Sequence, residues 1–277
     1  MTVFKRNTKF LRIVMFIFNL AINCKQNLIL ERAAGLTLRV LLAFFPFLVF
    51  LMSLMGFLNL QVDEILNGLY SIMPTEEISN LVAYFIKQLA ETRSTGLMST
   101  ALFFSVYNTS NGFRAVIRCT NMAYGIHERR SFPAQVGLSF ALMILFSAAL
   151  LIMLGLLVFG WQILIYIFPY GSVVLFVALS AVAAMIVLFV FTSCIYKMAC
   201  AIKLPYKHIL PGAAVTVVAW IVVSAGIGFV TQNFSQYPAI YGSIAGVFIL
   251  ILWLNAVSTI LLVGNEFNAL LHDFYSA

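Results

Sequence analysis

Six long apolar stretches, set apart by more polar segments, mark the pattern of hydrophobic and polar positions along this chain. A helix needs about 20 apolar residues to cross the hydrocarbon layer of a bilayer. Helices satisfy their own backbone groups there, and these runs lack the alternation that is typical of barrel strands. The predicted spans are Val40–Leu60, Gly96–Ile117, Val136–Trp161, Ser172–Tyr196, Ile209–Thr231 and Tyr241–Val263.

The pattern therefore predicts an all-α, polytopic integral membrane protein. Its six transmembrane helices form one domain at 40–271, between a cytoplasmic, interfacial segment at 1–39 and a cytoplasmic tail at 272–277. The first apolar stretch, Phe10–Ala21, is interrupted by Arg12 and Asn19 and lacks the cleavage site of a secretory signal. We expect this stretch to lie in the inner headgroup region as an interfacial helix, with a re-entrant helix as the alternative.

The segment between the first two spans, 61–95, has a helical periodicity of its own. Apolar residues recur at helical spacing before Pro74 and again after it, which predicts an external pair of amphipathic helices. Thr75 can cap the second helix of the pair. We expect this pair to pack as a lid on the outer ends of the spans, with partner docking or gating as the alternative.

Composition supports a membrane protein. Hydrophobic residues make up 63% of the chain, charged residues 9%, and the mean hydropathy is +1.04, which excludes a water-facing globule. With an inside N-terminus, 14 of the 16 Lys and Arg residues fall on inner segments, and only Lys87 and Arg93 fall outside. This bias places the protein in the cell membrane with both termini in the cytoplasm.

The net charge of +7 predicts attraction to membrane lipids, through anionic headgroups at the cytoplasmic face. It does not predict nucleic-acid binding, because no RNA- or DNA-reading motif accompanies it. The cysteines and histidines show no metal-ligand spacing, and no Walker motif is present, so we predict no metal and no cofactor. Because no nucleophile and base stand at helical spacing, we also predict that the chain is not an enzyme.

The second predicted span carries an unusual polar face. Its apolar run is too short to cross the membrane alone, and polar side chains on its continuation share one arc of the helix, namely Thr100, Tyr107, Asn108, Asn111, Arg114 and Arg118. Charged groups at membrane depth are costly, so such a face should avoid lipid. We expect it to border a cavity or to form interhelical hydrogen bonds.

Polar residues also occur in and beyond the last span. Asn255 lies near its middle, and Glu266 lies just past its inner end. Glu266 could form an ion pair with one of three arginines, Arg39, Arg114 or Arg118. A proton or substrate site at Glu266 is the alternative, since an ionisable residue near the membrane is a functional candidate.

Short motifs follow one another in an order that is specific as a set. They are Ala34–Thr37, Phe45–Leu48, Ser110–Arg114, Asn121–Gly125, Arg129–Phe132, Leu210–Ala213 with Trp220, Ile240–Ser243, Trp253 and Gly264–Asn268. From about Glu31 to Leu271, the chain resembles the YihY/virulence factor BrkB family of bacterial inner-membrane proteins. That family has no settled activity, so the resemblance implies a fold, a location and site residues. Some members carry an old ribonuclease label, which this sequence does not support, because it has no clustered His, Asp or Glu ligands.

Two sets of candidate residues follow. The candidates for binding substrate or lining a cavity are Tyr107, Asn108, Asn111, Arg114, Arg118, Asn121, Tyr241, Asn255, Glu266 and Asn268. The candidates for a kink or a conformational role are Pro46, Pro211, Gly212 and Gly242, of which Pro46 should kink the first span and Pro211 should lie in the first turn of a helix.

We predict transport or translocation of an anionic or amphipathic substrate, such as a lipid. The polar face of the second span and the basic inner rim motivate this hypothesis. The alternative is a non-transporting envelope scaffold that organises membrane partners through the external helical pair. Either protein could act as a homo-oligomer or with an envelope protein partner.

Overall fold

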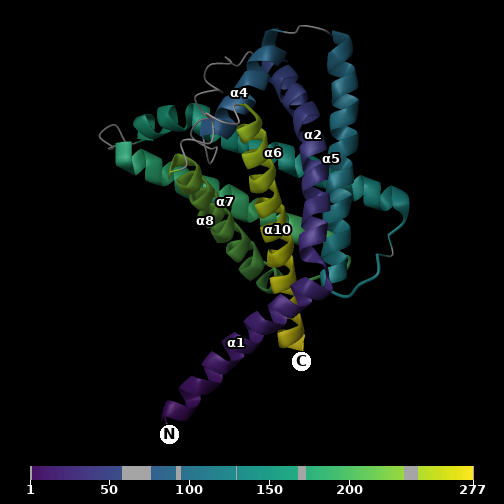
Figure 1. Cartoon of the computed structure of the whole chain (residues 1–277), viewed down its shortest axis with the longest axis vertical. Coiled ribbons are helices and arrows are strands. Elements are labelled where there is room, and N and C mark those ends of the chain that lie inside the picture. Colours follow the sequence, from purple (N-terminus) through teal and green to yellow (C-terminus); the bar gives the residue numbers. More distant parts are fainter. Residues whose placement is uncertain are drawn as a thin grey trace.

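The computed structural model describes residues 2–57, 76–91, 95–128, 130–167, 173–233 and 243–276, and its regular elements there are all helical (Figure 1). The elements are α1 (Thr2–Gln26), α2 (Ile29–Phe57), α4 (Glu76–Glu91), α5 (Thr95–Ala123), α6 (Phe132–Ile167), α7 (Val173–Ala199), the 3-10 helix η1 (Tyr206–His208), α8 (Leu210–Asn233) and α10 (Ser243–Ser276).

Four stretches in the described residues are long and apolar enough to cross a membrane. They are Phe132–Met153, Ala178–Ala199, Tyr206–Thr231 and Ala245–Tyr275, with mean hydropathies of 2.3 to 2.5. They coincide with the third to sixth predicted spans, so the prediction of a helical membrane protein with several spans is confirmed. The first two predicted spans fall largely within α2 and α5, and their crossing of the membrane stays a prediction.

Helices α2, α5 and α10 run side by side, while α7 and α8 slant away from α10 and α6 crosses behind the group (Figure 1). The outward faces of α6, α7 and α8 expose large apolar side chains, among them Ile144, Ile186 and Val222. A helix that is apolar all round and largely unburied in its own chain is typical of a membrane span in contact with lipid.

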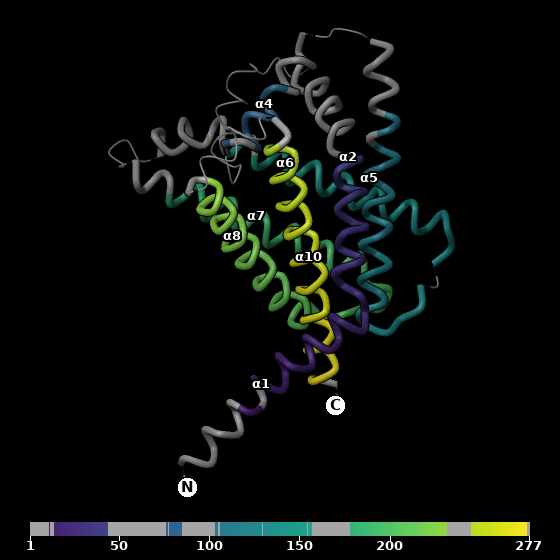
Figure 2. The backbone as a smooth tube through the Cα atoms, viewed as in Figure 1, coloured from purple at the N-terminus to yellow at the C-terminus, as the bar shows by residue number. Residues whose placement is uncertain are grey.

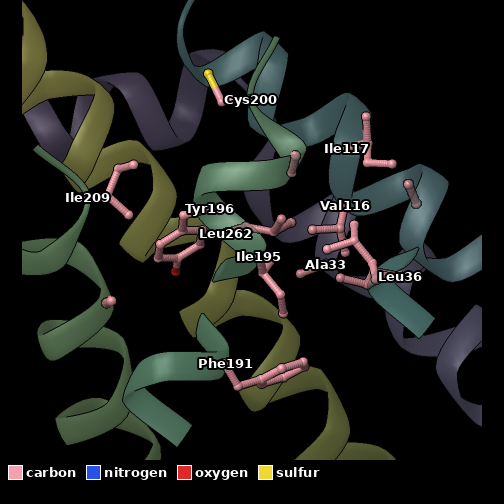
Figure 3. Close-up of a cluster of buried hydrophobic side chains, with 14 of the residues drawn as sticks. Ala33, Leu36, Val116, Ile117, Phe191, Ile195, Tyr196, Cys200, Ile209 and Leu262 are labelled. Carbon is pink, nitrogen blue, oxygen red and sulfur yellow. The ribbon is translucent and has the colours of Figure 1, made fainter. Parts of the chain in front are cut away.

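A buried apolar core lies near the start of α2 and α8 and near the ends of α5 and α7 (Figure 3). Ala33 and Leu36 of α2 lie against Val116 of α5, and residues of α7 and α10 close the core. Ala33 is fully buried, and its small side chain lets the backbones of α2 and α5 approach closely. This core fixes the positions of the polar groups that surround it.

One polar contact within this core joins three helices. The Tyr196 hydroxyl of α7 lies 2.7 Å from the Thr216 hydroxyl of α8 and donates to the Leu261 carbonyl of α10 at 2.7 Å. Gly264 of α10 faces this contact, because a Cβ there would lie 1.9 Å from the Thr216 Oγ1 atom. Glycine is therefore required at the point where α7, α8 and α10 meet.

Helix α4 corresponds to the second helix of the predicted external pair, whereas the first helix lies outside the described residues. Its apolar face buries Ile78 and Val82 against Leu250 and Leu254 of α10. Helix α4 therefore packs on the side of α10, about two to three turns from the start of that helix. Its place outside the membrane stays a prediction.

Helix α1 extends away from the other helices (Figures 1 and 2). It joins α2 through a break at Asn27 and Leu28, where Leu28 has a φ of 49°. The ring of Phe16 packs on Phe267 and Phe274 of α10, with centroid distances of 5.0 and 5.8 Å. Other apolar side chains of α1 are exposed, a pattern consistent with the interfacial helix that the sequence predicts.

Candidate functional site

The predicted polar face of α5 is partly exposed in the described chain. We call Tyr107, Asn111, Arg114 and Arg118 the α5 arginine face. Tyr107 is 56% exposed, Arg118 is also exposed, and Asn111 and Arg114 are half-buried. The expectation that this face borders a cavity or forms interhelical hydrogen bonds stays a prediction.

Other residues of α5 make its contacts with the neighbouring helices. Ser110, Ala115 and Val116 are buried. The Ser110 and Ser139 hydroxyls form a 2.6 Å hydrogen bond between α5 and α6. Small side chains such as those of Ser110 and Ala115 allow helices to pack closely.

Arg114 contacts neutral groups in the described residues. Its Nη2 atom donates to the Asn111 side-chain oxygen, and its guanidinium lies 5.5 Å from the centre of the Phe132 ring. Its Nε atom is buried and has no hydrogen-bond partner among those residues. In that part of the chain no carboxylate forms an ion pair with this guanidinium.

The α5 arginine face is long and carries net positive charge. Arg118 lies eleven positions after Tyr107, which is about 16 Å along a helix, or roughly half of the hydrocarbon layer. Arg32 and Arg39 of α2 lie close enough to Cys119 to act on it electrostatically, as Arg118 does. The neighbouring surfaces of α2 and α5 therefore share several positive charges.

A second polar group, the Glu266 cluster, lies where α2 begins, α5 ends and α10 approaches its end. It comprises Asn27, Arg32, Tyr124, Asn265 and Glu266, of which Asn265 and Glu266 are buried. Asn27 donates from Nδ2 to the Glu266 Oε1 atom at 2.7 Å, and Glu266 is only 1% exposed. The other carboxyl oxygen, Oε2, has no hydrogen-bond partner in the described part of the chain.

The ion pair expected between Glu266 and one of three arginines is not formed. Among the described residues, the ion pair within 4.0 Å is that of Arg130 with Glu128. Arg39, Arg114 and Arg118 are turned toward the outer surface of the α2–α5 pair or lie along α5, whereas Glu266 faces the junction of α1 and α2. Arg32 is the basic residue that acts electrostatically on Glu266.

Two candidate asparagines serve the scaffold. Asn121 accepts a 2.7 Å hydrogen bond from the Ala201 backbone N–H and donates to Glu128. Arg130 donates to the Cys200 carbonyl at 2.7 Å, so these contacts join the loop after α5 to the loop after α7. Asn121 is buried at 1% exposure.

Asn268 joins α10 to the start of α8. Its side-chain oxygen accepts from the Gly212 N–H at 2.7 Å, and its Nδ2 donates to the Ile209 carbonyl at 3.0 Å. Pro211 is the second residue of α8, as predicted, and Asn268 caps a backbone N–H that the first turn leaves without a helical partner. A Cβ on Gly212 would lie 2.3 Å from the Asn268 oxygen, so this contact requires glycine.

The remaining candidates are not brought together. Asn108 is half-buried, and the Asn255 amide lies 3.5 Å from the Thr37 hydroxyl, a long contact. Helix α2 continues through Pro46, whose kink stays a prediction. Tyr241 and Gly242 lie outside the described residues.

The structure also assembles groups that sequence reasoning had left scattered. His208 and His272 lie 64 positions apart, yet their Nδ1 atoms are 3.0 Å from each other. The His272 ring also lies near the Tyr124 ring, with a centroid distance of 6.0 Å. No local motif signals this pair, nor the pairing of Asn27 with Glu266, because each forms only when the ends of the helices meet.

Comparison with known proteins places the whole helical domain in one family. The pattern of the family described as "Virulence factor BrkB" matches residues 21–277. The chain is 34% identical over 248 residues to the "Putative ribonuclease-like protein YfkH" of Bacillus subtilis, an alignment that covers 87% of this chain and 90% of that protein.

Shorter alignments match other bacterial membrane proteins. A UPF0761 membrane protein of Tolumonas auensis is 34% identical over 80 residues, which are 29% of this chain and 26% of that protein. Another from Xanthomonas campestris is 35% identical over 82 residues, 30% of this chain and 19% of that protein. No solved structure matches. The chain is a membrane protein of the virulence factor BrkB family.

Proposed function

We propose that this protein moves an anionic amphipathic substrate, such as an anionic phospholipid, along the α5 arginine face between the two sides of the membrane. The observation that carries this proposal is the placement of the half-buried Arg114 and the exposed Arg118 on one face of α5. A lipid phosphate would occupy the polar face while its acyl chains stay in the surrounding bilayer.

The energetics favour an anionic occupant. A single arginine near the membrane centre costs roughly 2.5 to 3.5 kcal/mol on insertion scales. Arg114 has a buried Nε donor without a partner among the described residues, and its guanidinium lies beside Asn111 and an aromatic ring. A phosphate oxygen on the accessible side of this guanidinium would neutralise its charge, because guanidinium and phosphate form strong charge-assisted hydrogen bonds.

The geometry also suits a substrate with two chemical halves. Phe103 and Phe104 are exposed on the same side of α5 as Tyr107, with a T-shaped contact of 6.0 Å between their ring centroids. The two aromatic rings precede Tyr107 along α5 and the arginines follow it, so an amphipathic molecule would find an apolar and a charged contact on the same side of the helix. The polar stretch covers only about half of the hydrocarbon layer, so the substrate would cross the other half beside apolar side chains.

This proposal assigns no catalytic role. The term ribonuclease-like belongs to the name of the Bacillus subtilis relative. In the described part of this chain, no group of three or more His, Cys, Asp or Glu residues could hold a metal ion. The cytoplasmic basic residues would instead attract anionic headgroups to the inner end of the α5 arginine face.

The test is a lipid-movement assay with reconstituted protein. Vesicles carrying a labelled anionic phospholipid on one leaflet should equilibrate the label faster with wild-type protein than without protein. Arg114→Gln and Arg118→Gln should slow this movement severalfold, whereas Lys207→Gln, which removes an exposed charge on η1, should leave it unchanged. Equal rates in protein-free vesicles, or unchanged rates in both arginine variants, would favour the scaffold alternative.

A further inference from the structure

Glu266 combines burial with an incomplete set of partners. Its carboxyl group is 1% exposed, receives one hydrogen bond from the neutral amide of Asn27 and has a second oxygen without a partner among the described residues. No Lys or Arg nitrogen in those residues lies within 4.0 Å of it. An ionised carboxylate is expensive to bury unless it is paired, so this position favours the binding of a proton.

The groups around Glu266 come from every helix that meets there. Arg32 of α2 is the charged group that acts on it, at more than ion-pair distance. Cys24 of α1, Cys119 of α5 and Tyr124 in the turn after α5 lie within electrostatic reach of it. The thiols and the phenol are neutral at physiological pH, so one arginine opposes the cost of burial.

The hydrogen bond to Asn27 connects this carboxyl group to the position of α1. Asn27 lies in the two-residue break between α1 and α2, next to Leu28 with its φ of 49°. The neighbouring residue of Glu266, Phe267, packs on Phe16 of α1 at a centroid distance of 5.0 Å. The α1–α2 junction is therefore held to α10 by one polar and one aromatic contact.

We propose that Glu266 is a reversible proton-binding site whose ionised form fixes the junction of α1 and α2 through Asn27. An amide donates a stronger hydrogen bond to a carboxylate than to a neutral carboxylic acid. Proton uptake would weaken the polar contact and free α1 to move on its aromatic contact. This inference does not depend on the substrate or on the α5 arginine face.

Cys24 provides a built-in reporter of the charge on Glu266. Burial, and then the negative charge of Glu266, raise the pKa of the Cys24 thiol to about 11. Only the thiolate reacts with an alkylating reagent, so the logarithm of the rate should rise with pH at a slope of one. The charge of Glu266 makes its part of this increase only after Glu266 has lost its proton, so ionisation of Glu266 displaces the line downward.

The experiment uses full-length protein in which Cys24 is the only cysteine, treated with iodoacetamide across a range of pH. With Glu266 in place, a plot of the logarithm of the alkylation rate against pH should show two parallel lines joined by an inflection where Glu266 titrates. Glu266→Gln should give one straight line and, above the inflection pH, severalfold faster alkylation. Glu31→Gln, which removes an exposed carboxyl group on α2, is the matched control and should keep the inflection.

Glu266→Asp keeps a carboxyl group and should keep an inflection, which provides a second readout if the glutamine variant folds poorly. A straight line for the protein with Glu266 intact would overturn the proposal. An inflection that persists in Glu266→Gln would overturn it as well, because another group would then be titrating. If the wild-type protein moved no lipid in the reconstituted vesicles but its Cys24 alkylation still showed the inflection, that result would count against the transport proposal alone.

Discussion

Gly264 lies where three helices meet, and adding one methyl group there should lower the free energy of unfolding of the protein by disturbing its buried core. A Cβ at this position would lie 1.9 Å from the Thr216 Oγ1 atom and 2.6 Å from the Tyr196 hydroxyl oxygen. Both atoms are buried, and the nearer belongs to a short side chain on a packed helix. Gly264→Ala must therefore push α8 or α7 away from α10.

The cost of this change can be worked from its parts. Overpacking a core typically costs about 1 to 3 kcal/mol. Separation of the Tyr196 and Thr216 hydroxyls would remove a 2.7 Å hydrogen bond, which contributes about 1 kcal/mol. Alanine regains about 0.5 to 1 kcal/mol through its higher helix propensity. The net destabilisation expected for Gly264→Ala is therefore roughly 1 to 3 kcal/mol.

Thermal unfolding of the detergent-solubilised protein would measure this loss. Gly226→Ala on α8 is the matched control, because a Cβ there meets nothing within 4 Å. The control should unfold at the same or a slightly higher temperature, whereas Gly264→Ala should unfold at a clearly lower one. Equal midpoints for the two variants would refute the close approach of α7, α8 and α10.

Further outcomes follow from the buried polar groups. Asn268→Ala should destabilise the protein by about 2 to 4 kcal/mol in the same assay, since two buried backbone groups lose their partners, while Asn255→Ala should cost much less. Burial raises the pKa of the Cys200 thiol, so its alkylation at neutral pH should be slow and should accelerate with each step up in pH; a plateau near neutrality would show an ionised thiol instead. Phe104→Cys, exposed on α5, should give no disulfide-linked dimer in membranes if lipid covers this surface, and a strong dimer band would show that a second copy covers it.

Much of the helical framework could be predicted because its cause is local. Long apolar runs between 132 and 275 are membrane spans by length and composition, and the structure places helices there. Pro211 fixes its own φ and lacks an N–H, so its position in the first turn of α8 was predictable from one residue. The periodicity after Pro74 likewise predicted α4 and its apolar face.

The direction in which the α5 arginine face points could not be predicted from the same reasoning. The cost of charge at membrane depth indicates that the face should avoid lipid, but it does not say whether a cavity or a neighbouring helix covers it. In the structure Tyr107 and Arg118 are exposed and Arg114 is half-buried, while Ser110 and Ala115 are buried. Which residues α5 buries depends on how α2 and α6 pack on it, and the sequence of α5 alone does not contain that arrangement.

The roles of the asparagines depend on contacts that are distant in sequence. Asn268 reaches Gly212 across 56 positions, and Asn27 reaches Glu266 across 239. An amide that caps a neighbouring helix looks the same in the sequence as an amide that lines a substrate path. Only the arrangement of the helix ends assigns Asn121 and Asn268 to the scaffold and leaves Glu266 with a free oxygen.

Photo-crosslinking at the α5 arginine face tests the account most directly. A photoreactive phenylalanine analogue in place of Tyr107 would be activated in vesicles that contain equal amounts of labelled anionic and zwitterionic phospholipids. We expect predominantly anionic lipid adducts, with a clear reduction when Arg114→Gln is added. Equal labelling of both lipids, or a crosslink to a second protein in place of lipid, would contradict the account.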